Sequence, residues 1–273
     1  MSGSDVMSTV EENVKLHEQD LKRLQGLCLM DDDFLNAFFK DNPEDTELML
    51  RIIMGKPDLK VKRVDVQDTL KNLRGRSIRI DIRATDSEGK EYGIEIQRAD
   101  QGAGIKRARY NNAVLDASIL RPGQDTEELP EVFTIFITDH DVMGRDKPIY
   151  SIDRYIMMDD GEYVPARDGS HILYVNGAKK GDSTDLEKLM HDFSCTRADD
   201  MYYEQLAKTM RYYKEDGKGV SIMCKAMEDM RNDVRIENAL KMINGGKLTL
   251  EEVAEYSGLS LEKVKELAGK MTA

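Results

Sequence analysis

The segment RIDIRATDSEGKEYGIEIQRAD, residues 79–100, most constrains the fold of this chain. Two stretches, SIRIDIRAT and KEYGIEIQR, alternate apolar and polar residues on either side of the short sequence DSEGK. Alternation with a period of two is typical of β-strands, and a three-residue loop with glycine in the left-handed position is a favoured hairpin connection. The segment therefore predicts an antiparallel hairpin whose loop is Ser87-Glu88-Gly89.

This loop also fixes the register of the hairpin. It pairs Asp86 with Lys90, so that opposed residue numbers sum to 176 and Asp81 faces Glu95. Opposed side chains on neighbouring strands lie about 4.5–5.5 Å apart at Cβ. Two carboxylates at that separation repel each other unless one is protonated or a cation lies between them. A divalent, oxygen-binding ion satisfies both, and Gln97 shares their face. The alternative is an exposed hairpin whose acids are neutralised by neighbouring arginines, Arg79 and Arg83.

The rest of the chain predicts helices around a central sheet. Helices are expected over 10–40, over 43–54 and over the GIKRARYNNAVLDASIL segment that ends before Pro122. Strands are expected at KVKRVDV, at the near-continuously apolar EVFTIFIT, and around IYSIDRYIMM and HILYV. Residues 185–242 read as helical. This order predicts an α/β fold with a mixed sheet flanked by helices and a C-terminal helical extension.

Four regions are expected along the chain: an N-terminal helix (1–30), an α/β core (31–184), a helical extension (185–243) and a tail (244–273). The tail segment LTLEEVAEYSGLSLEKVKELA predicts a helix-turn-helix with Ser260 as the N-cap of its second helix. A helix that reads DNA is expected to be basic. Because residues 247–270 carry four Lys against five Glu, the tail favours packing or protein contact over DNA recognition.

Charge is distributed unevenly. The net charge is −12, which by itself argues against a phosphate-binding partner. Between residues 60 and 109, however, there are 13 Lys and Arg against 8 Asp and Glu, a local +5 that leaves −17 elsewhere. The hairpin lies inside this basic region, although uneven scatter of charge explains it equally well.

Several classes of protein are excluded. No apolar run approaches the ~18 residues of a membrane span, and no basic start precedes an apolar stretch as in a signal peptide. The three cysteines are far apart and odd in number, which predicts neither a disulfide framework nor a zinc motif. A cytoplasmic protein is therefore expected, with a homodimer left open.

The pattern of Asp81 followed by Glu95-Ile96-Gln97 resembles the PD-(D/E)XK nuclease superfamily. Within it, the chain is most similar to the recombination-promoting nucleases, also called PD-(D/E)XK family transposases. The segments RARYNN, LPEVFTIFIT, SHILYVNG and LMHDFSCTRADDMYYEQLAKTMRYYKE carry the wider resemblance, over roughly residues 30–235. It implies a PD-(D/E)XK nuclease-like core and Mg²⁺-dependent hydrolysis of DNA phosphodiesters, with Mn²⁺ as a possible substitute.

The resemblance also implies roles for residues. Asp81, Glu95 and Gln97 would be catalytic, and Mg²⁺ would be bound by Asp81, Glu95 and the backbone carbonyl of Ile96. Members of the superfamily often use a further acid from the first helices to bind the metal. Glu47 and Asp31 are candidates, and Glu47 is taken as the ligand. DNA contact would come from residues after the hairpin: Arg98, Lys106, Arg107 and Arg109.

Gln97 departs from the lysine usual in the superfamily, because an amide can hold a water but supplies no charge. Three hypotheses follow. The first is a metal-dependent DNA endonuclease. The second is a catalytically inactive nuclease fold that acts as a DNA- or protein-binding regulator, as Gln97 and the acidic remainder of the chain suggest. The third, a regulator that binds DNA through its C-terminal helices, is disfavoured by the charge of the tail.

Overall fold

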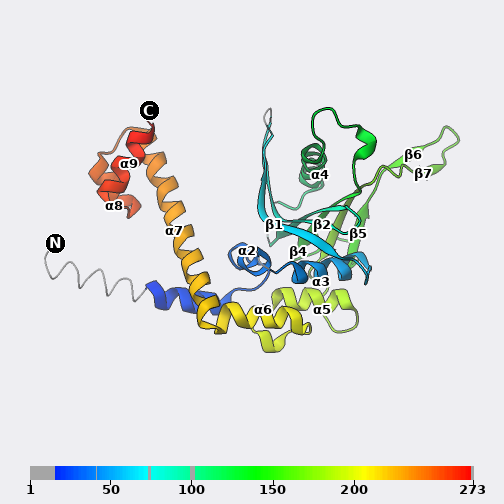
Figure 1. Cartoon of the computed structure of the whole chain (residues 1–273), viewed down its shortest axis with the longest axis horizontal. Coiled ribbons are helices and arrows are strands. Elements are labelled where there is room, and N and C mark those ends of the chain that lie inside the picture. Colours follow the sequence, from blue (N-terminus) through cyan, green and yellow to red (C-terminus); the bar gives the residue numbers. More distant parts are fainter. Residues whose placement is uncertain (1–15, 41, 73–74, 99–101, 272–273) are drawn as a thin grey trace. The chain divides into compact units, whose positions relative to one another are not determined.

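The computed structural model describes residues 16–40, 42–72, 75–98 and 102–271 of the 273-residue chain (Figure 1). These residues form two compact units. One unit spans residues 25–216 and contains the main sheet. The other combines residues 16–24 with residues 217–271.

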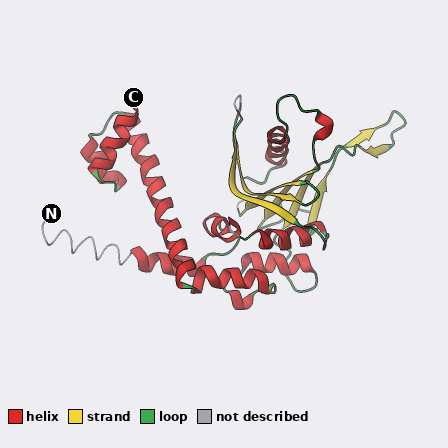
Figure 2. Ribbon diagram, in the orientation of Figure 1, coloured by secondary structure: helices red, strands yellow, loops and turns green. Residues whose placement is uncertain are grey.

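The larger unit is built on a six-stranded mixed sheet (Figure 2). Its spatial order is β1 (Val61–Leu70), β2 (Ile78–Asp86), β3 (Glu91–Gln97), β4 (Val132–Thr138), β8 (Ser170–Asn176) and β5 (Ile149–Ile152). The β1–β2 and β2–β3 pairs are antiparallel, β3, β4 and β8 run parallel, and β5 returns antiparallel to β8. All seven residues of the central β4 are buried, as expected for a strand covered on both faces.

Helices cover both faces of this sheet (Figure 1). They are α2 (Asp32–Lys40), α3 (Pro43–Met54), α4 (Ile105–Ile119), α5 (Asp185–Ser194) and α6 (Glu204–Glu215), with short 3₁₀ turns at Thr126–Glu128 and Ala198–Asp200. Helix α4 packs on one face, where Leu115 joins Ile80 and Val132 in the core. Helices α2 and α3 lie against the other face, with α5 and α6 beyond them. The predicted mixed α/β fold with flanking helices is confirmed.

The hairpin has the predicted register. Residue pairs from Ile82 with Ile94 to Thr85 with Glu91 all sum to 176. The amide of Asp86 donates to the carbonyl of Lys90 at 3.1 Å, and Gly89 has φ +85°. The turn chemistry therefore sets the alignment of both strands.

The simple alternation of faces is wrong near Asp81. Gly93 pairs with Arg83, so these two share a face, yet a Cβ on Gly93 would also contact the side chain of Ile80. Residues 80 and 83 therefore point to the same side, which strict alternation forbids. The break coincides with Gln67 of β1, whose φ is +53° and which is absent from the pairing with β2 that is regular from Arg63 to Leu70 on either side of it. Asp81 thus lies at a local irregularity of the sheet.

The smaller unit is helical. It contains residues 16–24, part of a helical run over 16–26, together with α7 (Gly217–Gly245), α8 (Leu250–Ser257) and α9 (Leu261–Met271). The predicted helix-turn-helix corresponds to α8 and α9, around Ala239, Val253 and Val264. The expected boundary at 184/185 differs from this division, because α5 and α6 belong to the unit of the sheet.

A second, two-stranded sheet forms where short strands were expected. Strands β6 (Tyr155–Met157) and β7 (Tyr163–Pro165) pair antiparallel and project from the main sheet (Figure 1). Within the described ranges, every helix is too short or too polar to cross a bilayer.

Candidate active site

The site begins where β2 and β3 separate. Their ladder pairing ends at Ile82 and Ile94, one residue before Asp81. Beyond this point a side chain replaces the backbone ladder: Oδ2 of Asp81 accepts the backbone N–H of Ile96 at 2.9 Å. Gln67 Nε2 lies 3.5 Å from Oδ1 of the same carboxylate. Asp81 is thereby held between two strands, and the residue is only 9% exposed.

Glu95 is the most deeply buried acid of the hairpin. It is 1% exposed, and its Oε2 accepts from Arg107 Nη2 of α4 at 3.0 Å. Its Oε1 is buried without a hydrogen-bond partner among the described residues. Burial, and then the nearby charge of Asp81, raise the pKa of Glu95 to about 8, while Arg107 opposes the shift. An unpartnered buried carboxylate oxygen is costly unless a further cation binds it.

A third acid lies near enough to act on Asp81 through its charge. Burial raises the pKa of Asp81, and the next largest contribution in that direction is the charge of Asp32, at the start of α2. Asp32 also lines the same cleft as Asp81. The sequence carries a signal for it, since Asp31, Asp32 and Asp33 are consecutive at a helix start. Of this run, the sequence alone points to Asp31, whereas Asp32 is the residue that lines the cleft.

Glu47, the acid carried forward from the sequence, lies elsewhere. Its carboxylate forms ion pairs with Arg51 and Lys60 and accepts the backbone N–H of Val61 at 2.9 Å. Asp31 is also engaged: it forms an ion pair with Arg98 and accepts the N–H of Cys28 at 2.9 Å. Neither Glu47 nor Asp31 lines the cleft. The geometry therefore favours Asp32 as the acid from the first helices.

The cleft has a volume of about 850 Å³. Its acidic residues are Asp32 and Asp81. Its cations come from the segment before β2, from β2 itself and from α4, and they are Arg76, Arg79, Lys106 and Arg107. The uncharged polar residues of the lining are Ser77, Gln97, Tyr110 and Asn111. A concentration of carboxylates surrounded by cations suits a ligand that carries both a metal and negative charge.

The four predicted DNA contacts separate in space. Lys106 and Arg107 line the cleft. Arg109 instead lines a separate hollow of about 160 Å³ together with Asp153 and Arg154, and Arg98 is paired with Asp31. Helical spacing alone suggested that Lys106 and Arg109 act together, but they open onto different hollows.

Gln97 lies beside Arg107. It is paired with Thr138 of β4, and its backbone carbonyl accepts the N–H of Asp139 at 3.1 Å. A Cβ on Gly102 would lie 2.5 Å from Gln97 Oε1 and 2.9 Å from Arg107 Nη1. The φ of Gly102 is +140°, a conformation that side chains rarely allow. Because glycine has no Cβ, the Gln97 amide and the Arg107 guanidinium can both lie against residue 102.

The donor set fits a hard divalent cation. Mg²⁺ binds oxygen ligands, usually one or two carboxylates with several waters. Asp81 and Glu95 provide such carboxylates, and the free Oε1 of Glu95 has no competing donor in the described part of the chain. Ile96 lies between Glu95 and Gln97, and its amide is fixed by Asp81.

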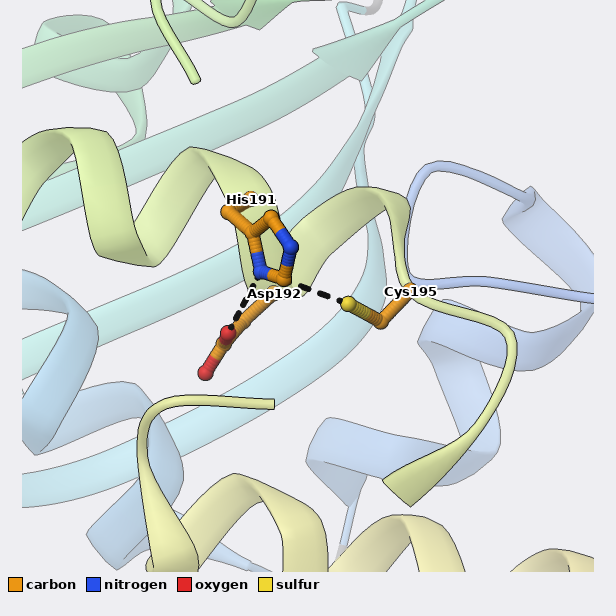
Figure 3. Close-up of side chains that lie close together, drawn as sticks. All are labelled: His191, Asp192 and Cys195. Atoms are coloured by element: carbon orange, nitrogen blue, oxygen red, sulfur yellow. Dashed lines mark hydrogen bonds and ion pairs between the residues drawn. The ribbon is translucent and has the colours of Figure 1, made fainter. Parts of the chain in front are cut away.

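A second cluster of candidate metal ligands lies outside the cleft (Figure 3). His191 Nδ1 is 3.3 Å from Asp192 Oδ1 and 3.4 Å from Cys195 Sγ. Both oxygens of Asp192 already accept backbone N–H groups, from Tyr202 at 2.8 Å and Tyr203 at 2.9 Å. Burial, with the charge of Asp192, raises the pKa of the Cys195 thiol to about 11. Asp192 therefore holds the segment that leads into α6, through the amides of Tyr202 and Tyr203. The spacing of His191 and Cys195 could have revealed it.

The larger unit is thus an α/β domain with a mixed sheet, whose β2–β3 hairpin places the buried Asp81 in a cleft lined by cations, with the charge of Asp81 acting on the buried Glu95. The chain belongs to the PD-(D/E)XK nuclease family transposases, since residues 32–190, more than half of its length, match that family. No curated protein and no solved structure matches it significantly.

Proposed function

We propose that this protein is a Mg²⁺-dependent DNA endonuclease, with Mn²⁺ as a substitute ion. The observation that carries the proposal is the buried, unpartnered oxygen of Glu95, which lies behind the cationic cleft within reach of the charge of Asp81, a residue that lines it. A purely structural ion pair would leave no such oxygen. The three free cysteines, Cys28, Cys195 and Cys224, keep the cytoplasm as the expected compartment.

Asp81, Glu95 and the backbone carbonyl of Ile96 would hold the ion, with Asp32 as the further acid. When bound, Mg²⁺ would supply the positive charge that acidifies a water and stabilises negative charge on the phosphate. Gln97 would orient that water through its amide, which can both donate and accept hydrogen bonds. Arg76, Arg79 and Lys106 would hold the DNA backbone through its phosphates.

Arg107 would supply the charge that Gln97 lacks. Its guanidinium bonds Glu95 and lies against Gln97 across Gly102. It therefore stands beside the position where the superfamily usually carries a lysine ammonium group. In this arrangement the amide positions the water and the arginine, from α4, neutralises charge. The two tasks of one lysine are divided between two residues.

A second candidate is a catalytically inactive nuclease fold that binds DNA or protein as a regulator. Gln97 favours it, because no lysine stands at that position, and so does the net −17 outside the basic segment. This candidate predicts DNA or partner binding that does not depend on a divalent ion.

Plasmid cleavage separates the two candidates. Supercoiled DNA is incubated with wild-type protein in Mg²⁺, Mn²⁺, Ca²⁺ or a chelator, and nicked and linear products are measured. Glu95→Gln is the test variant, and Glu91→Gln on the same strand is the matched control, because Glu91 is bound by Arg83 and Thr85. The endonuclease proposal predicts Mg²⁺-dependent products that Glu95→Gln loses and Glu91→Gln keeps. DNA binding without cleavage in any ion supports the regulator.

A further inference from the structure

The β6–β7 hairpin exposes an unusual concentration of apolar side chains. Six large apolar residues within ten positions are 38–67% exposed: Tyr155, Ile156, Met157, Met158, Tyr163 and Val164. The hairpin projects from the main sheet (Figure 1). A two-stranded hairpin is marginally stable by itself, and contiguous exposed apolar surface marks an interaction site. The hairpin thus has the character of an arm that binds another surface.

Only one edge of this arm can accept a full additional strand. Met158 N–H donates to Glu162 at 2.8 Å and Ala166 N–H donates to Arg154 at 2.9 Å. Bonded pairs alternate in an antiparallel ladder, so the intervening residues Tyr155 and Met157 direct their backbone groups outward from β6. The outward positions of β7 are Tyr163 and Pro165, and proline has no N–H to donate. The free edge is therefore that of β6.

Charge selects the kind of partner. The tip of the hairpin carries Asp159, Asp160 and Glu162, whereas Arg154 lies at its base. An acidic tip is repelled by DNA phosphates and by anionic membranes. Arg154 pairs with Asp168 of its own chain but is still 57% exposed, so an antiparallel copy of the strand would bring this arginine to the acids at the other end, as a two-fold interface requires.

We propose that β6 pairs antiparallel with β6 of a second copy of this chain, forming a four-stranded sheet across a two-fold axis. With the axis at Met157, the outward backbone groups of the two Met157 residues bond each other. Arg154 of each copy then lies opposite Asp160 of the other, and the exposed Tyr155 and Met157 side chains meet across the new edge. This homodimer does not depend on whether the cleft cuts DNA.

The first test removes the edge hydrogen bond. The full-length protein is measured by light scattering with gel filtration at rising concentration. Wild type is expected to shift from monomer to dimer, and Met157→Pro to remain a monomer because its edge lacks the central N–H. Tyr163→Pro is the matched control: it changes the outer edge of β7, and it is expected to dimerise. A wild-type protein that stays monomeric, or a Met157→Pro protein that dimerises normally, would overturn the proposal.

A charge exchange tests the register without altering the backbone. Arg154→Asp and Asp160→Arg alone are each expected to weaken dimerisation by roughly tenfold, because each places like charges opposite one another twice. Mixing the two variants restores both opposite-charge pairs, so a mixed dimer is expected to form as readily as wild type. Failure of the mixture to recover, while each variant alone is weakened, would overturn the assigned pairing.

Discussion

The two ends of the β2–β3 hairpin bury acids in opposite ways. At the turn end, Asp86 is 4% exposed, and its carboxylate accepts from the amides of Glu88 and Lys90 and from the hydroxyl of Tyr92, each at 2.9 Å. At the open end, Glu95 is 1% exposed, yet one of its oxygens is unpartnered in the described structure. Burial of an acid therefore does not by itself indicate function. A buried acid with a carboxylate oxygen that lacks a hydrogen-bond partner does.

The difference follows from the chain around each end. The tight turn returns backbone amides onto Asp86, which is how aspartate stabilises turns. At the open end the ladder between the strands ends, and the guanidinium that bonds Glu95 comes from α4. Consequently the turn end is expected to contribute to stability, and the open end to activity.

The largest effect is expected on catalysis at the open end. Asp81→Ala is expected to lower the cleavage rate by at least about 10²–10³, the typical cost of losing an interaction with the transition state. Glu47→Ala serves as the control, because its carboxylate is bound by Arg51, Lys60 and the Val61 amide. Initial rates on plasmid DNA measure both variants. Wild-type rates in both Asp81→Ala and Glu95→Ala would remove the site from this hairpin.

The next effect concerns stability at the turn end. Asp86→Ala leaves the buried Tyr92 hydroxyl and the backbone amides of Glu88 and Lys90 without their side-chain acceptor, so it is expected to cost roughly 2–4 kcal/mol in the free energy of unfolding. Glu95→Gln is expected to cost nothing or to stabilise at neutral pH, because the wild-type protein must take up a proton at Glu95 when it folds, whereas glutamine is neutral at every pH. Urea denaturation of both variants measures the difference. Equal losses would mean that the two ends do not differ as described.

A smaller effect on turnover is expected when the positive charge of Arg107 is removed and then restored at position 97. Arg107→Ala is expected to reduce turnover by about 10–100-fold, since general charge stabilisation at a site is lost. Adding Gln97→Lys to Arg107→Ala is expected to recover much of that loss by returning a cation to the superfamily's usual position. Arg83→Ala is the comparison at the turn end, where Arg83 bonds Glu91 and Asp68; it is expected to lower stability and spare turnover. No recovery in the double variant would contradict the division of roles between Gln97 and Arg107.

The pH dependence of stability is the mildest distinction. The folded-state pKa of Glu95 is raised to about 8, so the folded protein binds a proton that the unfolded chain releases near its usual value of roughly 4.3. Stability from this group is present at low pH and is lost as pH rises towards 8, by at most about 1.4 kcal/mol per pH unit. The free energies of unfolding of the metal-free wild type and of Glu95→Gln are measured across this pH range. The wild type is expected to lose stability relative to Glu95→Gln as the pH rises. A constant difference would contradict the raised pKa.

Much of this arrangement is readable from sequence because it is local. The turn DSEGK fixes the hairpin register, and the register places Asp81 near Glu95. What sequence misses depends on tertiary structure. The break in alternation opposite Gln67, the choice of Asp32 over Asp31 or Glu47, and the separation of Arg109 from the cleft are all set by packing between distant elements. The family resemblance supplies residue types, whereas only the fold shows which carboxylate oxygen is left unpartnered.

The most direct test of the account is divalent-ion binding at the open end of the hairpin. Calorimetric titration of Mn²⁺ at neutral pH, repeated in buffers of different ionisation enthalpy, measures both affinity and proton release. We expect the wild type and Glu91→Gln to bind the ion and to release protons, because the ion requires Glu95 to be ionised. We expect Asp81→Ala and Glu95→Gln to lose this binding. Equal Mn²⁺ affinity and proton release in all four proteins would contradict the claim that these buried carboxylates form a metal site.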